Sequence, residues 1–95
     1  MSSNGMEVTD TKSAVRAAKH YLQTLMAEED ISELGLEELD YNEGEGVWSV
    51  TLGFSRPWDR NALGAMTGGN PRNRSFRTLK VAPDGEVKSI RIRTI

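Results

Sequence analysis

The segment that decides the fold is "GVWSVTLGFSRPWDRN", residues 46–61, in which apolar and polar side chains alternate until the pattern stops at Pro57. Successive side chains of a β-strand point to opposite faces of a sheet. One face of this segment carries four large apolar side chains: Trp48, Val50, Leu52 and Phe54. Burial of each such side chain contributes about 1.5–3 kcal/mol before entropy losses. We therefore expect a central strand whose apolar face packs against a helix.

A helical pattern precedes this strand, from about Asp10 to Glu28. Apolar side chains recur there at the spacing of one helix face: Val15, Ala18, Leu22, Leu25 and Met26. Thr9 or Asp10 is the expected N-cap, since either side chain accepts a hydrogen bond from a free backbone N–H of the first turn. We expect this helix to cover the apolar face of the central strand.

Further strands are expected at residues 36–42, 74–81 and 87–95. The turn "APDGE", residues 82–86, joins the last two strands, because proline presets φ, aspartate bonds the local backbone and glycine takes the left-handed position. Phe76 is out of step with Leu79 and Val81, which leaves either a bulge or a strand with two apolar sides. The sequence thus predicts an α+β fold: one N-terminal amphipathic helix packed on a four-stranded antiparallel meander sheet, in the order α-β-β-β-β.

The length of the chain sets its domain organisation. Ninety-five residues suffice for one hydrophobic core and are too few for two. We expect a flexible N-terminal tail at residues 1–8 and a single domain at residues 9–95, with a long mobile loop at residues 55–73. Loops of that length are uncommon inside compact domains and tend to be functional or disordered.

Three features of the sequence occur together. The expected helix contains Ala14, Ala17 and Ala18, and it is followed by "LEELDYNEGEGVWSVTLGF" and then by "RTLKVAPDGEVKSI". Together they resemble the PepSY family of small domains with a cystatin-like α+β shape. The resemblance covers about residues 13–90. It implies the α+β fold and a regulatory role, since members of that family are linked to peptidase propeptides and to inhibition, and are typically exported or membrane-associated.

The composition argues against several classes of function. The chain has no cysteine, which excludes disulfides, thiol catalysis and cysteine-based zinc sites. His20, the single histidine, lies opposite the apolar helix stripe, and no nucleophile stands beside a base. The acidic residues between 28 and 33 lack the ligand spacing and the central glycine of a calcium loop. We therefore expect no enzyme activity, no metal and no cofactor.

Nothing in the sequence predicts contact with a membrane. No run approaches the roughly 18 apolar residues that a membrane helix needs. The N-terminus, "MSSNGMEVTDTK", lacks the basic and apolar regions of an export signal. The expected location is cytoplasmic.

Charge is segregated along the chain. Residues 1–45 carry three Lys and Arg against eleven Asp and Glu, a net charge of −8. Residues 46–95 carry nine against three, a net charge of +6. Two interpretations remain open: the basic half binds an anionic partner, or the two halves neutralise each other in the folded protein.

Candidate binding residues gather in the basic half. An arginine beside an exposed aromatic ring suits carboxylates, phosphates or single-stranded nucleic acid. The alternative is that Trp58 folds back to cap the core while the arginines extend into water. The candidates are Arg56, Trp58, Arg60, Arg72, Arg74, Arg77, Arg91 and Arg93.

These observations predict a small non-enzymatic binding or regulatory module. Its partner is expected to be a protein or peptide, engaged through the open face of the sheet, an edge strand or the loop that carries Trp58. That open face is expected to have an apolar component, which a partner or a second copy in a homodimer can cover: Val47, Leu79, Val81 and Ile95. The alternative function is binding of nucleic acid or another polyanion by the basic C-terminal half.

Overall fold

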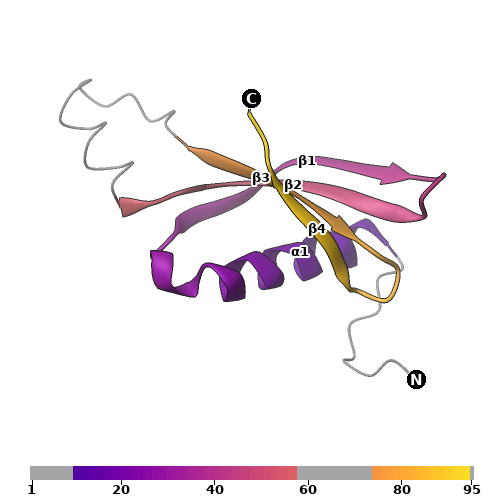
Figure 1. Ribbon diagram of the computed structural model, residues 1–95, viewed down its shortest axis with the longest axis horizontal. Helices are drawn as coiled ribbons and strands as arrows, with labels where there is room; N and C mark the ends of the chain where they lie inside the picture. Colours follow the sequence, from indigo (N-terminus) through magenta and orange to yellow (C-terminus); the bar gives the residue numbers. More distant parts are fainter. Residues whose placement is uncertain (1–9, 58–73, 95) are drawn as a thin grey trace.

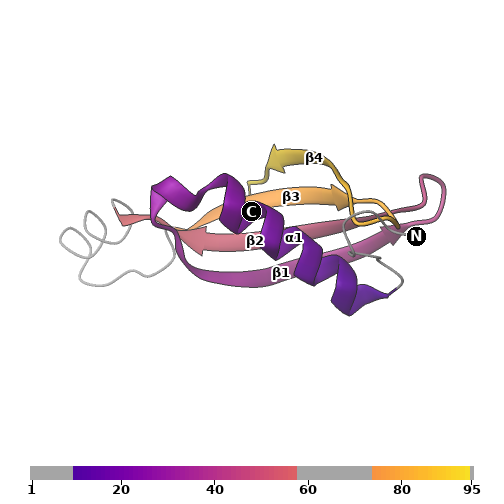
Figure 2. The same ribbon diagram turned by 90° about the horizontal axis from the view of Figure 1, so that it is seen from below.

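The fold is one helix on one face of a four-stranded antiparallel sheet (Figures 1 and 2). The computed structural model describes residues 10–57 and 74–94. The strands lie side by side in chain order, so the predicted α+β meander is confirmed. The predicted tail at residues 1–8 and most of the predicted loop at residues 55–73 lie outside the described residues. The elements are α1 Thr11–Leu25, η1 Ala27–Glu29, β1 Ser32–Asn42, β2 Val47–Ser55, β3 Ser75–Val81 and β4 Val87–Ile92.

Helix α1 buries a face of mostly small side chains against the sheet. The buried residues of this face are Ala14, Ala17, Ala18, Leu22 and Met26. Methyl side chains let the helix backbone approach the strands closely. The prediction that Leu25 belongs to this face is wrong, since Leu25 is 56% exposed. Helix α1 ends at Leu25 and the backbone turns at Met26, whose side chain covers the end of the core instead.

Strand β2 is the centre of the core. It lies between β1 and β3, and the side chains of Val50, Leu52 and Phe54 are fully buried. Trp48 packs against the same cluster, so the predicted alternation of β2 is confirmed. Helix α1 runs obliquely across this face of the sheet, and its N-terminal end lies beside β1 (Figure 2).

Strand β1 begins at Ser32, earlier than the predicted start at Leu36. Its register against β2 shifts between Ser32 and Gly35 and again between Leu36 and Glu38. Such irregularities change which face successive side chains occupy. Apolar and polar residues therefore do not alternate along the whole of β1, and the sequence predicts only part of the strand. The chain enters β1 from η1 through Asp30, which adopts the left-handed conformation with φ of 53°.

Strand β3 has two apolar sides. Phe76 stands opposite Gly53 on the face away from α1, whereas Leu79 and Val81 are fully buried on the α1 side. The pairing of β2 with β3 has no register shift, so the two-sided strand is confirmed and the bulge is not. The prediction that Leu79 and Val81 lie on the open face is wrong, because the unbroken register aligns them with the apolar face of β2.

The turn at residues 82–86 has the predicted local geometry. Gly85 adopts a positive φ of 88°. The backbone N–H of Glu86 donates to Asp84 Oδ1 at 2.9 Å, and the N–H of Gly85 donates to the carbonyl of Ala82 at 2.8 Å. The turn therefore closes the β3–β4 hairpin with its own residues, and the register of the hairpin shifts once beside it, between Lys80 and Val81.

Replacement of Gly53 by alanine is expected to destabilise the protein by about 1–3 kcal/mol. A Cβ atom at this position would lie 2.9 Å from Phe76 Cε1 and 2.8 Å from Arg74 Nη2, closer than ordinary van der Waals contact. The neighbouring side chains would have to move to admit the methyl group. The free energy of unfolding, measured by urea denaturation, gives the size of the loss.

Gly35→Ala is the matched control. Gly35 stands opposite Gly53 in the neighbouring strand, and nothing lies within 4 Å of a Cβ atom added there. This substitution is expected to leave stability unchanged or to raise it by about 0.4–1 kcal/mol, because alanine restricts the unfolded chain. Equal effects of the two substitutions would contradict the steric argument.

The N-cap of α1 predicts a pH effect. Asp10 Oδ1 accepts a hydrogen bond from the backbone N–H of Ser13 at 2.9 Å, as the capping prediction for Asp10 requires. The hydrogen bonds from Ser13, together with Arg16 and Lys12, hold the pKa of the Asp10 carboxyl below its ordinary value of 3.8. The cap therefore stabilises the folded state fully above the unfolded pKa, and this stabilisation is lost as pH falls through the lower folded pKa.

Asp10→Asn keeps a capping oxygen and removes the titration. We expect the difference in thermal midpoint between the two proteins to be constant near neutral pH and to shift in favour of the asparagine variant in acid. Thermal unfolding followed by circular dichroism from about pH 7 to about pH 2 measures this difference. Parallel pH profiles for the two proteins would show that the cap does not depend on the charge.

Candidate functional site

The face of the sheet opposite α1 is covered over β2 by long charged side chains of β1, of the residue before β3 and of the residue after β4. Arg93 Nη1 lies 2.7 Å from Glu38 Oε1 of β1, and the same nitrogen donates to Thr51 Oγ1 at 3.3 Å. Thr51 is only 2% exposed and Ser55 only 5%, although no helix of the described chain lies on this face. This cover is possible because β2, after Val47, presents small side chains there: Ser49, Thr51, Gly53 and Ser55.

Arg74 makes a second bridge across β2. Its Nη2 lies 3.4 Å from Glu37 Oε2, and its Nη1 lies 3.8 Å from Glu33 Oε1. Glu33 Oε1 also accepts a hydrogen bond from the hydroxyl of Ser55 at 3.0 Å. The side chains of Arg74 and Glu37 meet directly above the bare backbone of Gly53.

The ion pairs join the acidic and basic halves of the chain. Each of four cations from the second half lies within 4 Å of a carboxylate from the first half. Neutralisation between the halves is therefore confirmed for these residues, and it accounts for much of the charge segregation without a partner. The pairs are Arg56–Glu29, Arg74–Glu37, Lys80–Glu45 and Arg93–Glu38.

Half of the predicted site residues meet at the end of the sheet where β2 ends and β3 begins. Arg91 lies elsewhere, exposed on β4 opposite Thr78. A cavity of about 360 Å³ at this end is lined by Arg56, Arg74, Arg77 and Arg93. The remaining predicted residues lie outside the described part of the chain: Trp58, Arg60 and Arg72.

Two of these arginines cap the end of the core. The guanidinium carbons of Arg56 and Arg77 lie 5.7 and 5.5 Å from the centroid of the Phe54 ring, within the range of a cation–π contact. Arg56 Nη2 donates to Ser75 Oγ at 2.9 Å. Burial, and after it the charge of Arg56, lowers the pKa of Arg77 from its ordinary value. The cluster thus supports the core as well as presenting positive charge.

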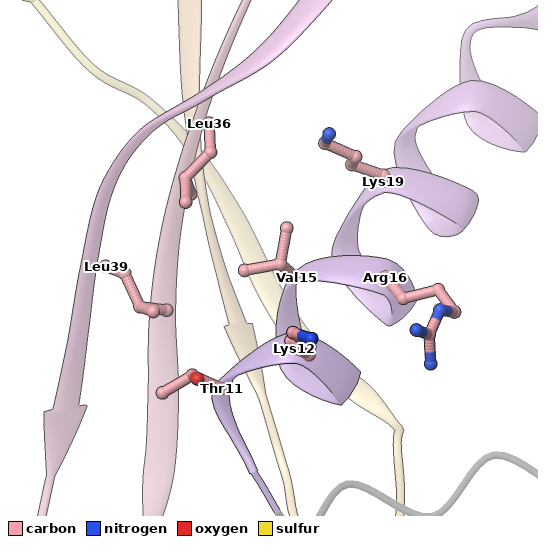
Figure 3. Close-up of a pocket in the computed structure, with 7 residues that line it drawn as sticks. All are labelled: Thr11, Lys12, Val15, Arg16, Lys19, Leu36 and Leu39. Atoms are coloured by element: carbon pink, nitrogen blue, oxygen red, sulfur yellow. The ribbon is translucent and has the colours of Figure 1, made fainter.

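A second cavity, which the sequence does not predict, lies between α1 and β1. It is a groove of about 430 Å³. Val15 of α1 faces Leu36 and Leu39 of β1 across it (Figure 3). Leu36 is 45% exposed, so the apolar floor of the groove is open to solvent. The rim on α1 carries three cations: Lys12, Arg16 and Lys19.

These three rim cations are the only Lys and Arg in residues 1–45. Their spacing of i, i+4 and i+7 places them along one side of α1. Within the part of the chain that the structure describes, no carboxylate oxygen lies within 4 Å of their charged nitrogens. In the acidic half of the chain, all Lys and Arg residues lie on one side of one helix. This pattern is the sequence signal that would have predicted the groove.

Strand β1 is an edge of the sheet. It pairs with β2 on one side, and no strand of the described sheet pairs with its other side. An edge strand of this kind presents backbone N–H and C=O groups to which another strand can bond. Leu39 and Tyr41 face the α1 side of this edge, whereas Glu38 and Asp40 face the opposite side.

No group of three or more His, Asp or Glu side chains within residues 10–57 and 74–94 is placed to hold a metal ion. Over the same residues, no helix combines the length and the apolar character that a membrane crossing requires. No protein-family model matches the chain, and no characterised protein and no solved structure is significantly similar to it. The function is therefore inferred from the two cavities and the edge strand.

Arg74→Gln is expected to lower the free energy of unfolding by about 0.5–1 kcal/mol at low salt. The substitution removes the ion pairs with Glu33 and Glu37 that cover β2. The Arg74 side chain is only 20% exposed, so salt screens these pairs incompletely. Urea denaturation at low and high salt measures the loss, which shrinks as the salt concentration rises.

Arg91→Gln is the matched control, because it removes the same charge from an exposed position on β4. No carboxylate of the described residues forms an ion pair with Arg91. Its effect on stability is expected to stay within about 0.5 kcal/mol. If both variants unfold at the same urea concentration, the charged cover over β2 contributes nothing to stability.

Proposed function

We propose that this protein is a non-enzymatic binding module that engages a protein or peptide through the groove between α1 and β1. The observation that carries the proposal is an apolar groove whose three rim cations have no carboxylate within 4 Å among the described residues. Apolar floors supply binding energy, and a charged rim supplies specificity and a faster association. A partner that carries apolar and acidic side chains satisfies both.

The other surfaces considered for a protein partner support the proposal less. On the outer face of the sheet, the central strand is covered by ion pairs such as Arg93–Glu38, and a partner would have to displace them. The loop that carries Trp58 lies outside the described residues. The groove, by contrast, offers exposed apolar side chains and cations that form no ion pair within 4 Å with a described carboxylate.

Binding of nucleic acid or another polyanion by the basic half is the second proposal. The arginine-lined cavity at the end of β2 supports it. Three of the four lining arginines, however, already have a carboxylate within 4 Å: Arg56, Arg74 and Arg93. A polyanion would compete with these internal partners, and its affinity would fall steeply with salt.

Selection from a displayed library of random peptides tests the groove. We expect the enriched peptides to carry acidic and apolar side chains. We expect them to bind the Lys12→Glu, Lys19→Glu double variant at least about tenfold more weakly than the wild type, since repulsion replaces attraction at the rim. Lys88→Glu is the matched control, because Lys88 is exposed on β4 at the opposite edge of the sheet. It should leave the affinities unchanged.

Circular dichroism and the unfolding transition of each variant verify that the fold is retained. Peptides that bind the wild type and the double variant equally would overturn the proposed site. Salt-sensitive binding of single-stranded DNA that Arg93→Gln weakens, and the double variant does not, would instead assign the function to the basic half.

A further inference from the structure

We propose that the occupant of the groove is an extended peptide that adds to β1 as a fifth strand. Its side chains toward α1 are apolar and acidic, and those on the opposite side are basic. This inference rests on the proposed function and specifies the backbone conformation and the charge pattern of the partner. Three features of β1 and its surroundings lead to it: a regular edge, an apolar side beneath cations, and an acidic side.

The regular part of the β1 edge is its C-terminal half. Glu38–Asn42 pairs residue by residue with β2, whereas the register shifts nearer the start of the strand. Bulges blunt a sheet edge against further pairing, and a regular stretch does not. A new strand therefore pairs with Glu38–Asn42, where alternate backbone N–H and C=O groups point away from β2.

Side chains on the α1 side of the new strand enter the groove. Leu39 and Tyr41 lie on this side of the regular stretch, and Tyr41 is 42% exposed. Lys12 and Arg16 on the rim are separated by about 6 Å along the helix axis. Side chains on one side of an extended peptide are about 6.7 Å apart. Because α1 crosses the sheet obliquely, the separation of the two cations along the strand is shorter than along the helix axis, and the long side chains of Lys12 and Arg16 make up the difference to acidic residues at alternate positions of the peptide.

The opposite side of the β1 edge is acidic. Glu38 and Asp40 are exposed on it. Glu38 already pairs with Arg93, whereas Asp40 forms no ion pair with a described cation and supplies the free negative charge. Opposite charges that face each other on neighbouring strands attract, and like charges repel. Basic side chains on this side of the peptide are therefore favoured. A second copy of β1 is disfavoured, because antiparallel pairing of two such strands would bring the carboxylates of both copies together.

The two sides of the edge thus select opposite charges. Lys12, Arg16 and Lys19 stand on one side, and Glu38 and Asp40 stand on the other. Alternate side chains of a strand point to opposite sides. The edge therefore selects a peptide whose charge alternates with a period of two residues, which a helical or disordered ligand does not present.

Fluorescence anisotropy with labelled synthetic peptides of about seven residues tests the charge pattern. One peptide alternates apolar or acidic residues with basic residues. Its control has the same composition, but residues of the same class stand next to each other in pairs. Neither face of the extended control peptide therefore carries only one class of side chain. We expect the alternating peptide to bind the full chain at least about tenfold more tightly than the control. Equal affinities would overturn the proposed pattern.

N-methylation of alternate peptide amides tests strand addition and leaves the protein unchanged. In an added strand, one set of alternate N–H groups bonds to the neighbouring strand and the other set faces water. We expect methylation of one set to weaken binding at least about tenfold, and methylation of the other set to have little effect. This asymmetry distinguishes a strand from a ligand held by its side chains alone.

The outcomes separate this inference from the proposed function. If neither methylated set loses affinity while the Lys12→Glu, Lys19→Glu double variant still does, strand addition is overturned and groove binding stands. If the alternating peptide binds the wild type and the double variant with equal affinity, groove binding is overturned as well. Sedimentation that detects a dimer of the chain, dissociated by the alternating peptide, would identify a second copy as the natural occupant and overturn the peptide.

Discussion

The packing of α1 on one face of the sheet, with β2 at the centre of the core, is the interaction on which the rest of the structure depends. One helix can cover only one face of a four-stranded sheet. On the other face, Arg93 reaches Glu38 at 2.7 Å and Arg74 reaches Glu37 at 3.4 Å, both across the central strand. These bridges can form because β2 carries Gly53 and other small residues beneath them. The core is thus protected by a helix on one side and by ion pairs on the other.

The same bridges give the charge segregation an architectural role. Individual ion pairs with exposed partners contribute little to stability. Together, the bridges cover β2 and hold the carboxylates of β1 close to Arg74 and Arg93. Three of the five candidate arginines that the structure describes already pair with a carboxylate: Arg56, Arg74 and Arg93. The cations of α1 lie on the opposite side of the sheet from these bridges, at the rim of an apolar groove. Charge that the fold does not neutralise therefore indicates the binding surface better than charge density does.

Local patterns predicted the elements, and non-local pairing set their details. The alternation of β2, the N-cap at Asp10 and the turn around Gly85 depend on neighbouring residues and were predictable. The early start of β1 depends on register shifts against β2, and the exposure of Leu25 depends on where α1 ends. Of the predicted site, the structure brings Arg56, Arg74, Arg77 and Arg93 together and leaves Arg91 apart, because antiparallel pairing and not sequence spacing determines which arginines meet.

The sequence by itself determined the fold class, the order of the elements and the apolar face of the central strand. Hydrophobic periodicity and turn signals depend on residues that are close together in the sequence, so they can be recognised from a single sequence. Only the tertiary structure decided which cations are neutralised and which are not. It also created the groove, whose floor joins Val15 with Leu36 and Leu39. This arrangement exists because α1 crosses the sheet obliquely and brings its N-terminal half beside the edge strand, a geometry that no local pattern specifies.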